Sequence, residues 1–238
     1  MGLKEFETRS TRKIFRKFFY PSLDEFSKIS KMYKSAKDLL NDLYQKRLSS
    51  NLEMEYSIVT KLLETNYKKL KLKYPLNWKV EEESARLIYY LVRLAKPKTI
   101  VETGVANGHS TFIILKALEK NNYGTLTSID ISQKAGVLID SDMKKNWNLV
   151  VIKPNAKSIR RFFEKFDRNI DIFIHDSNHS FFWQSLEYSL ALPHMSGHSI
   201  LLSDDIDTSY AFYNFCVRQN GVAFILYDNR KLFGLLKI

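Results

Sequence analysis

The stretch Thr99-Ile-Val-Glu-Thr-Gly-Val-Ala-Asn-Gly-His-Ser-Thr111 decides the fold. It begins as a β-branched strand, passes through a loop that contains Gly104 and Gly108, and enters a helix near Ser110. Glycine lets the backbone pass close to a bound ligand, and the first turn of a helix offers free N–H groups. The next predicted strand ends in a carboxylate, Asp130. We therefore predict a nucleotide-type ligand site at the carboxyl ends of parallel strands.

From Thr99 onward the chain alternates between predicted strands and predicted helices, which is typical of an α/β domain. Strands are expected at 99–103, 125–130, 148–152, 171–176, 198–204, 222–228 and 232–237. Helices are expected at 109–121, 133–145, 156–167, 180–192 and 208–219. Because helices separate the first five strands, these should be parallel, with right-handed crossovers. The last two strands are joined by Asp228-Asn-Arg-Lys231 alone, a hairpin-length link that predicts an antiparallel final strand.

Residues 1–75 are expected to form a helical extension, followed by a second unit at 76–238. Within and just after the extension, helices are expected at 29–48, 52–70 and 81–95, and Ser22-Leu-Asp-Glu25 resembles a capping box that opens a further helix. An apolar cluster lies among basic residues near the N-terminus and consists of Ile14, Phe15, Phe18 and Phe19. We expect this cluster to cover the ligand pocket or to contact a second subunit; a membrane-surface helix is the alternative.

The composition fits a globular protein with a net charge of +11, and much of the basic excess lies in the first 80 residues or so. These lysines and arginines are expected on solvated helix faces, although contact with nucleic acid or with an anionic membrane would also explain them. Cys216 is the single cysteine, which excludes an internal disulfide and a cysteine-based zinc cluster. No apolar run is long enough for a membrane span, and no signal core is visible, so a cytoplasmic location is expected.

The glycine spacing favours one ligand class over another. A dinucleotide site uses G-x-G-x-x-G, whereas this chain has Glu102-x-Gly104-x-x-x-Gly108 with Ala106 at the middle position. A carboxylate before the turn would repel a pyrophosphate but would suit a cationic amino group. The motif resembles the first motif of the class I S-adenosylmethionine-dependent methyltransferases, and the resemblance covers roughly residues 80 to 238.

This resemblance implies a Rossmann-like, seven-stranded, mostly parallel sheet with an antiparallel last strand, preceded here by the helical extension. It also implies S-adenosylmethionine as the cofactor. Its methionine amino group would lie near Glu102 and Gly104, with Gly108 and Ser110 completing the loop. Its ribose hydroxyls would bond Asp130. Its adenine would lie by the small polar pair after the third predicted strand, Asn155 and Ala156.

Three carboxylates follow two further strands: Asp176 after one, and Asp204 with Asp205 after another. If these strands are neighbours, the carboxylates converge, and their mutual repulsion favours a bound cation. Mg²⁺ suits a few carboxylates together with substrate and water. His179 lies three residues beyond Asp176, and histidine can accept a hydroxyl proton at neutral pH.

This arrangement resembles the metal-dependent small-molecule O-methyltransferases, the catechol O-methyltransferase type and its sugar- and antibiotic-modifying relatives. The resemblance implies Mg²⁺ on Asp176, Asp204 and Asp205, with His179 as the base and Asp176 beside the reacting oxygen. The run His175-Asp-Ser-Asn-His-Ser180 is similar to the D-x-D-H-S-Y segment of the polysaccharide- and antibiotic-associated branch, but Phe181 stands where a tyrosine is usual.

The sequence therefore predicts methyl transfer to a hydroxyl of a small molecule, of the sugar, catechol or natural-product type, by an enzyme that can associate through its N-terminal helices. A nucleic-acid methyltransferase is the first alternative. Amino-group methylation usually carries a D/N-P-P-Y/F motif, where this chain has His175-Asp-Ser-Asn178. Cytosine C5 methylation needs a nucleophilic cysteine in a loop, whereas Cys216 falls in a predicted helix. A non-catalytic subunit that binds the cofactor is the second.

Overall fold

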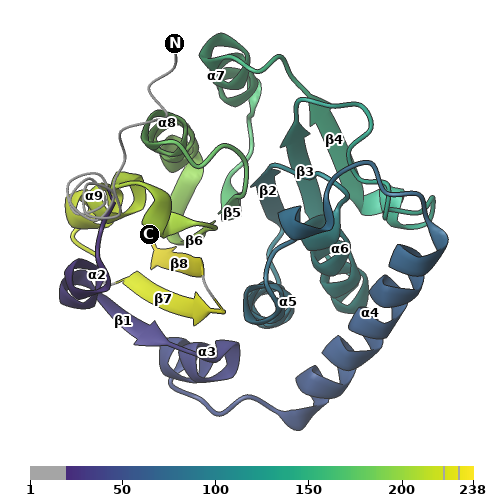
Figure 1. Cartoon of the computed structure of the whole chain (residues 1–238), viewed down its shortest axis with the longest axis horizontal. Helices are drawn as coiled ribbons and strands as arrows, with labels where there is room; N and C mark the ends of the chain where they lie inside the picture. The colour runs from purple at the N-terminus through teal and green to yellow at the C-terminus, as the bar shows by residue number, and fades with distance from the viewer. Residues whose placement is uncertain (1–19, 222, 230) are drawn as a thin grey trace, which may run out of the picture.

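The computed structural model describes residues 20–221, 223–229 and 231–238, and the apolar cluster at Ile14, Phe15, Phe18 and Phe19 lies outside them. A central, twisted sheet runs through the molecule with helices on both sides (Figure 1). This confirms the predicted α/β fold class. Among the described residues, every helix is too short or too polar to span a lipid bilayer.

The sheet of the described residues has eight strands in the order β1-β7-β8-β6-β5-β2-β3-β4. β8 is antiparallel to β7 and to β6, and the other pairings are parallel, as predicted for the final hairpin. The strands are β1 (Ser30–Tyr33), β2 (Thr99–Thr103), β3 (Thr125–Asp130), β4 (Trp147–Val151), β5 (Ile170–His175), β6 (Met195–Ser203), β7 (Ala223–Asp228) and β8 (Lys231–Lys237). The acids predicted after two neighbouring strands therefore do come from neighbours, β5 and β6.

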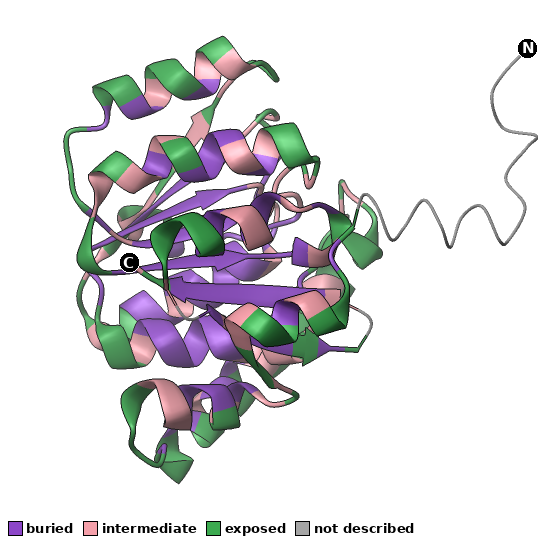
Figure 2. Ribbon diagram, turned by 90° about the vertical axis from the view of Figure 1, so that its left-hand side faces the viewer, coloured by how far each residue is buried: buried purple, intermediate pink, exposed green. Residues whose placement is uncertain are grey.

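Two apolar cores cover the two faces of the sheet, and Figure 2 shows the buried strands between the helix layers. One core packs α3 (Ala36–Tyr44), α4 (Ser50–Lys69), α5 (Glu82–Ala95) and α6 (His109–Asn121) against the strands. The other packs α2 (Leu23–Ile29), α7 (Ala156–Lys165), α8 (Phe181–Ala191) and α9 (Ala211–Gln219). The predicted capping box before α2 is confirmed, because Ser22 and Glu25 bond each other's backbone N–H groups.

The helix predicted over 133–145 is wrong. The chain there is a series of turns that ends in a short 3₁₀ helix, Met143–Asn146. Its backbone bonds to the glycine loop instead: Gly136 N–H donates to the carbonyl of Ala106 over 2.8 Å, and Leu138 N–H donates to that of Asn107 over 3.0 Å. Tertiary hydrogen bonds thus replace those that a helix would have made.

The helix predicted over 29–48 is also wrong in its first part. Residues Ser30–Tyr33 form β1, which pairs in parallel with β7 at the edge of the sheet, and Ser35 then caps α3. The Tyr33 ring stacks on Phe224 of β7 with centroids 6.2 Å apart. An available sheet edge outweighs the helical pattern of this short segment. The division of the chain at residue 75 stays a prediction, although β1 makes part of the extension a strand of the sheet.

Candidate active site

A cavity of about 770 Å³ lies at the carboxyl ends of β2, β3, β5 and β6. The glycine loop, the end of β3 and the acidic cluster all line it. The connection between α4 and α5 also lines the cavity, with Tyr74 and Trp78. Asn107 fixes this connection, since its side-chain oxygen accepts from the backbone N–H groups of Lys73 and Tyr74 over 3.0 and 3.1 Å.

Gly104 allows the end of β2 to pass directly beside the loop that follows β5. Its φ is +84°, and a Cβ at this position would lie 1.9 Å from the backbone oxygen of Asp176. Gly104 lines the cavity. Gly108, with φ of +91°, is the residue before α6 and lies behind the lining. Both glycines are therefore favoured by their positive φ, and only Gly104 lines the cavity.

Asp130 both shapes the loop and faces the cavity. One carboxylate oxygen accepts from the N–H groups of Val105 and Ala106 over 2.9 and 3.3 Å, and the other accepts from Ser132 N–H over 2.9 Å. A carboxylate can accept about four hydrogen bonds. It therefore keeps acceptor capacity for hydroxyl groups of a ligand in the cavity, the role predicted for it.

Glu102 is fully buried and does not line the cavity. Its carboxylate accepts from the hydroxyls of Ser110, Thr111 and Ser128 over 2.6, 2.7 and 2.8 Å. Burial raises the pKa of this carboxyl, and the three hydroxyl donors oppose that shift. The Glu102 side chain thus ties the start of α6 to β2 and β3. Of Glu102 and Ser110, only Ser110 lines the cavity.

The predicted adenine pair lies just outside the lining. Asn155 caps α7, where its side-chain oxygen accepts from Ser158 N–H over 2.9 Å, and Ala156 is the first residue of that helix. Apolar residues line this part of the cavity instead, namely Ile131 after β3 and Ile152 after β4. Sequence reasoning missed both, although an isoleucine directly after a strand-ending acid was a usable signal.

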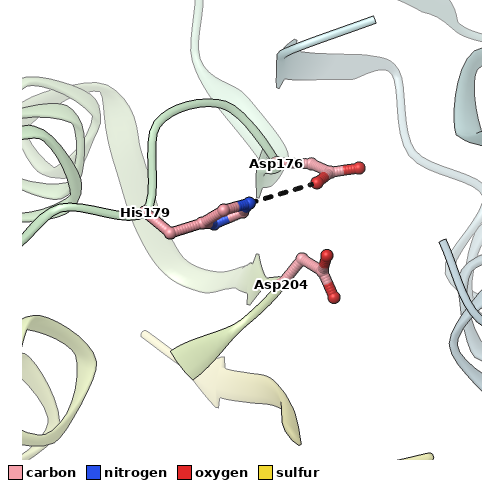
Figure 3. Close-up of side chains that lie close together, drawn as sticks. All are labelled: Asp176, His179 and Asp204. Atoms are coloured by element: carbon pink, nitrogen blue, oxygen red, sulfur yellow. Dashed lines mark ion pairs between the residues drawn. The ribbon is translucent and has the colours of Figure 1, made fainter. Parts of the chain in front are cut away.

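Asp176, His179 and Asp204 form a compact group. One potential ligand atom from each lies within 4.8 Å of the others. Figure 3 shows their side chains converging from the loop after β5 and from the end of β6. His179 Nε2 lies 3.9 Å from Asp176 Oδ1 and 3.7 Å from an oxygen of Asp205. Burial, and then the neighbouring Asp204, raise the pKa of Asp176, while burial and Asp205 raise that of Asp204 to about 6.

The sequence analysis expected Mg²⁺ in this cluster but did not anticipate a lysine side chain there. Lys231 Nζ lies 3.3 Å from Asp204 Oδ2 and 3.2 Å from Asp205 Oδ2. Lys231 therefore pairs with both Asp204 and Asp205, and Asp204 also belongs to the group with Asp176 and His179. The predicted hairpin was the signal that could have placed Lys231 here. Because β8 lies between β6 and β7, its first residue, Lys231, lies near the end of β6 that carries Asp204.

A buried pair supports the loop that carries Asp176 and His179. His175 Nδ1 lies 2.6 Å from Glu187 on α8, and both side chains are essentially inaccessible to solvent. The same carboxylate accepts from Ser177 and Trp183 over 2.9 and 2.6 Å. The contacts of His175 and Ser177 hold the end of β5 and the start of this loop against α8, beside Asp176.

Comparisons with known proteins agree with this geometry. Residues 101–206 match a family model described as a methyltransferase domain. The chain carries a class I methyltransferase fold. That match spans the glycine loop, the end of β3 and the acidic cluster. The family match and the fold together confirm the predicted resemblance to methyltransferases. No curated protein sequence matches the chain.

Solved structures show the same fold at low sequence identity. An O-methyltransferase from Bacillus cereus in complex with S-adenosylhomocysteine is 13% identical, with a TM-score of 0.60, covering 86% of this chain and 98% of its own. The O-methyltransferase TomG from Streptomyces achromogenes, in complex with S-adenosylmethionine, is 14% identical, with a TM-score of 0.56 and coverage of 100% and 99%. The Podospora anserina methyltransferase PaMTH1 is 11% identical, with a TM-score of 0.55 and full coverage of both chains.

Proposed function

We propose that this protein transfers the methyl group of S-adenosylmethionine to a hydroxyl oxygen of a small molecule. One observation carries the proposal: a single cavity joins the glycine loop and Asp130 to Asp176, His179 and Asp204. The domain match supports methyl transfer, and the printed descriptions of the Bacillus and Streptomyces neighbours name O-methyltransferases. The sugar, catechol and natural-product classes of acceptor all stay open.

In this proposal the cofactor lies along the ends of β2 and β3. Asp130 accepts hydrogen bonds from the ribose hydroxyls, the adenine lies between Ile131 and Ile152, and Gly104 allows the methionine part to approach the backbone. Glu102 does not line the cavity and acts indirectly, by fixing the N-terminus of α6. Asn155 and Ala156 support the adenine side through the start of α7.

His179 is proposed as the base. Its Nε2 takes the proton of the acceptor hydroxyl, the oxygen forms a bond to the methyl carbon, and the carbon–sulfur bond breaks to leave S-adenosylhomocysteine. The proton then passes from His179 to solvent. Much of the acceleration would come from holding two reactants side by side in the cavity.

The donor set also fits a hard divalent cation. Asp176 and Asp204 converge in this cluster, and Asp204 Oδ1 is buried with no hydrogen-bond partner among the described residues. We propose Mg²⁺ on Asp176 and Asp204, with Asp205 adjacent, where it would lower the pKa of the acceptor oxygen. His179 would then stay available for the proton.

Further proposals concern the partners of the protein and its location. Association through the N-terminal helices is supported by the exposed side chains of Met54, Ile58 and Leu62, which follow each other at four-residue intervals along α4. Nucleic-acid or anionic-membrane contact is a weaker proposal and rests on the net charge of +11. A cytoplasmic location stays a prediction.

Asp130→Ala should weaken S-adenosylmethionine binding by at least about 1 kcal/mol, roughly fivefold, because hydrogen bonds to a charged acceptor are lost. Calorimetric titration of the folded variant measures this effect. Asp142→Ala, at an exposed acid away from the cavity, is the control and should bind like the wild type. Equal affinity in Asp130→Ala and the wild type would refute the assignment of the ribose site. A screen of hydroxyl-bearing acceptors then tests the reaction itself.

A further inference from the structure

Lys231 places an ammonium group on the acidic cluster, where the proposed function places a divalent cation. Its Nζ lies within 3.3 Å of carboxylate oxygens from both Asp204 and Asp205. The lysine side chain is 17% exposed and that of Asp204 is 3% exposed, so bulk water screens the pair weakly.

The hairpin holds this lysine in place. Lys231 is the first residue of β8 and pairs with Asp228, the last residue of β7. The carboxylate of Asp228 is itself fixed, since it accepts from the N–H and the hydroxyl of Ser84 at the start of α5 over 2.7 and 3.0 Å. The backbone at Lys231 is therefore anchored through Asp228, and its side chain reaches the cluster from that position.

The two oxygens of Asp204 have different surroundings. Oδ2 faces the ammonium group, while Oδ1 is buried and has no hydrogen-bond partner among the described residues. A divalent cation shared by Asp176 and Asp204 would lie close to a fixed positive charge and be repelled by it. The cluster therefore has an ammonium counter-ion of its own, and it also has an acceptor atom still open to a second cation.

We propose that Lys231 is a built-in counter-ion of the acidic cluster and competes with divalent cations for Asp204 and Asp205. A metal ion that binds Oδ1 of Asp204 is repelled by the ammonium group on Oδ2, so the wild-type affinity for the metal is weak. The acids stay assembled without a metal. This inference deepens the proposed function and rests on it for the role of the cluster.

The test is a titration of the full chain with Mn²⁺, in which electron paramagnetic resonance measures the concentration of the free ion. Lys231→Met should bind Mn²⁺ at least about tenfold more tightly than the wild type, because a nearby like charge is removed. Lys231→Gln removes the charge but keeps a polar end, and it should show a similar gain in Mn²⁺ affinity. It serves as the test variant if Lys231→Met folds poorly. Lys231→Arg keeps the charge and should stay close to the wild type.

Lys237→Met, at the exposed far end of β8, is the matched control and should not change Mn²⁺ affinity. Thermal melts give a second readout: the neutral variants should melt below the wild type without metal and recover more on Mn²⁺ addition. Equal Mn²⁺ affinity in the wild type and both neutral variants would overturn the inference. Calorimetry with S-adenosylmethionine separates the counter-ion role of Lys231 from the proposed function. Wild-type protein that does not bind S-adenosylmethionine would refute the proposed function, whatever the Mn²⁺ result.

Discussion

His179→Ala should slow methyl transfer by about 10²–10⁴-fold, the usual contribution of a positioned base, while S-adenosylmethionine still binds. The reason is geometric, since His179 belongs to the group with Asp176 and Asp204 after β5 and β6, whereas Asp130 ends β3 and β2 lies between them in the sheet. Single-turnover kinetics with an accepted substrate, together with calorimetry for the cofactor, make the measurement. His198→Ala, at an exposed histidine, is the control and should keep full activity.

The pH dependence follows from the same residue. Burial, together with the neighbouring His175, lowers the pKa of His179 to about 4. The imidazole is therefore neutral, and able to accept a proton, throughout the neutral range. The wild-type rate should not lose this base between pH 8 and 6 and should fall only as pH approaches the lowered pKa. In His179→Ala the residual rate should rise towards high pH, where the acceptor ionises unaided. A variant with the wild-type rate and profile would remove His179 from the mechanism.

Gly104→Ala should abolish cofactor binding and destabilise the fold. A Cβ at this position would lie 1.9 Å from the backbone oxygen of Asp176, and φ of +84° is unfavourable for alanine. Strain and overpacking together should cost roughly 2 to 5 kcal/mol of unfolding free energy. Thermal or denaturant unfolding and S-adenosylmethionine calorimetry measure both effects.

Gly197→Ala is the matched control, because a Cβ at that position would have no neighbour within 4 Å. It should change neither stability nor cofactor affinity. If Gly104→Ala bound the cofactor and melted like the control, the close approach of β2 to the Asp176 loop would not describe the protein in solution.

The strands that carry the site could be predicted because their signals are local. A β-branched run followed by glycine marks β2, and β3 ends at its acid as predicted. The convergence of Asp176 and Asp204 followed from topology, since the ends of adjacent parallel strands meet.

The errors arose where distant segments decide the local structure. The turns that replace the helix predicted over 133–145 bond to the glycine loop, and β1 forms because the edge of β7 is free to pair with it. Lys231 was missed because only the insertion of β8 beside β6 brings it to the acids. The surroundings of Glu102 were out of reach for the same reason, because sequence cannot show that three hydroxyls from α6 and β3 bond it, and its role toward the cofactor stays a prediction.

Calorimetric titration of the full chain with S-adenosylmethionine tests the central claim most directly. We predict saturable binding of one cofactor per chain, clearly weakened in Asp130→Ala and retained in His179→Ala. Folded wild-type protein that binds neither S-adenosylmethionine nor S-adenosylhomocysteine would contradict the account.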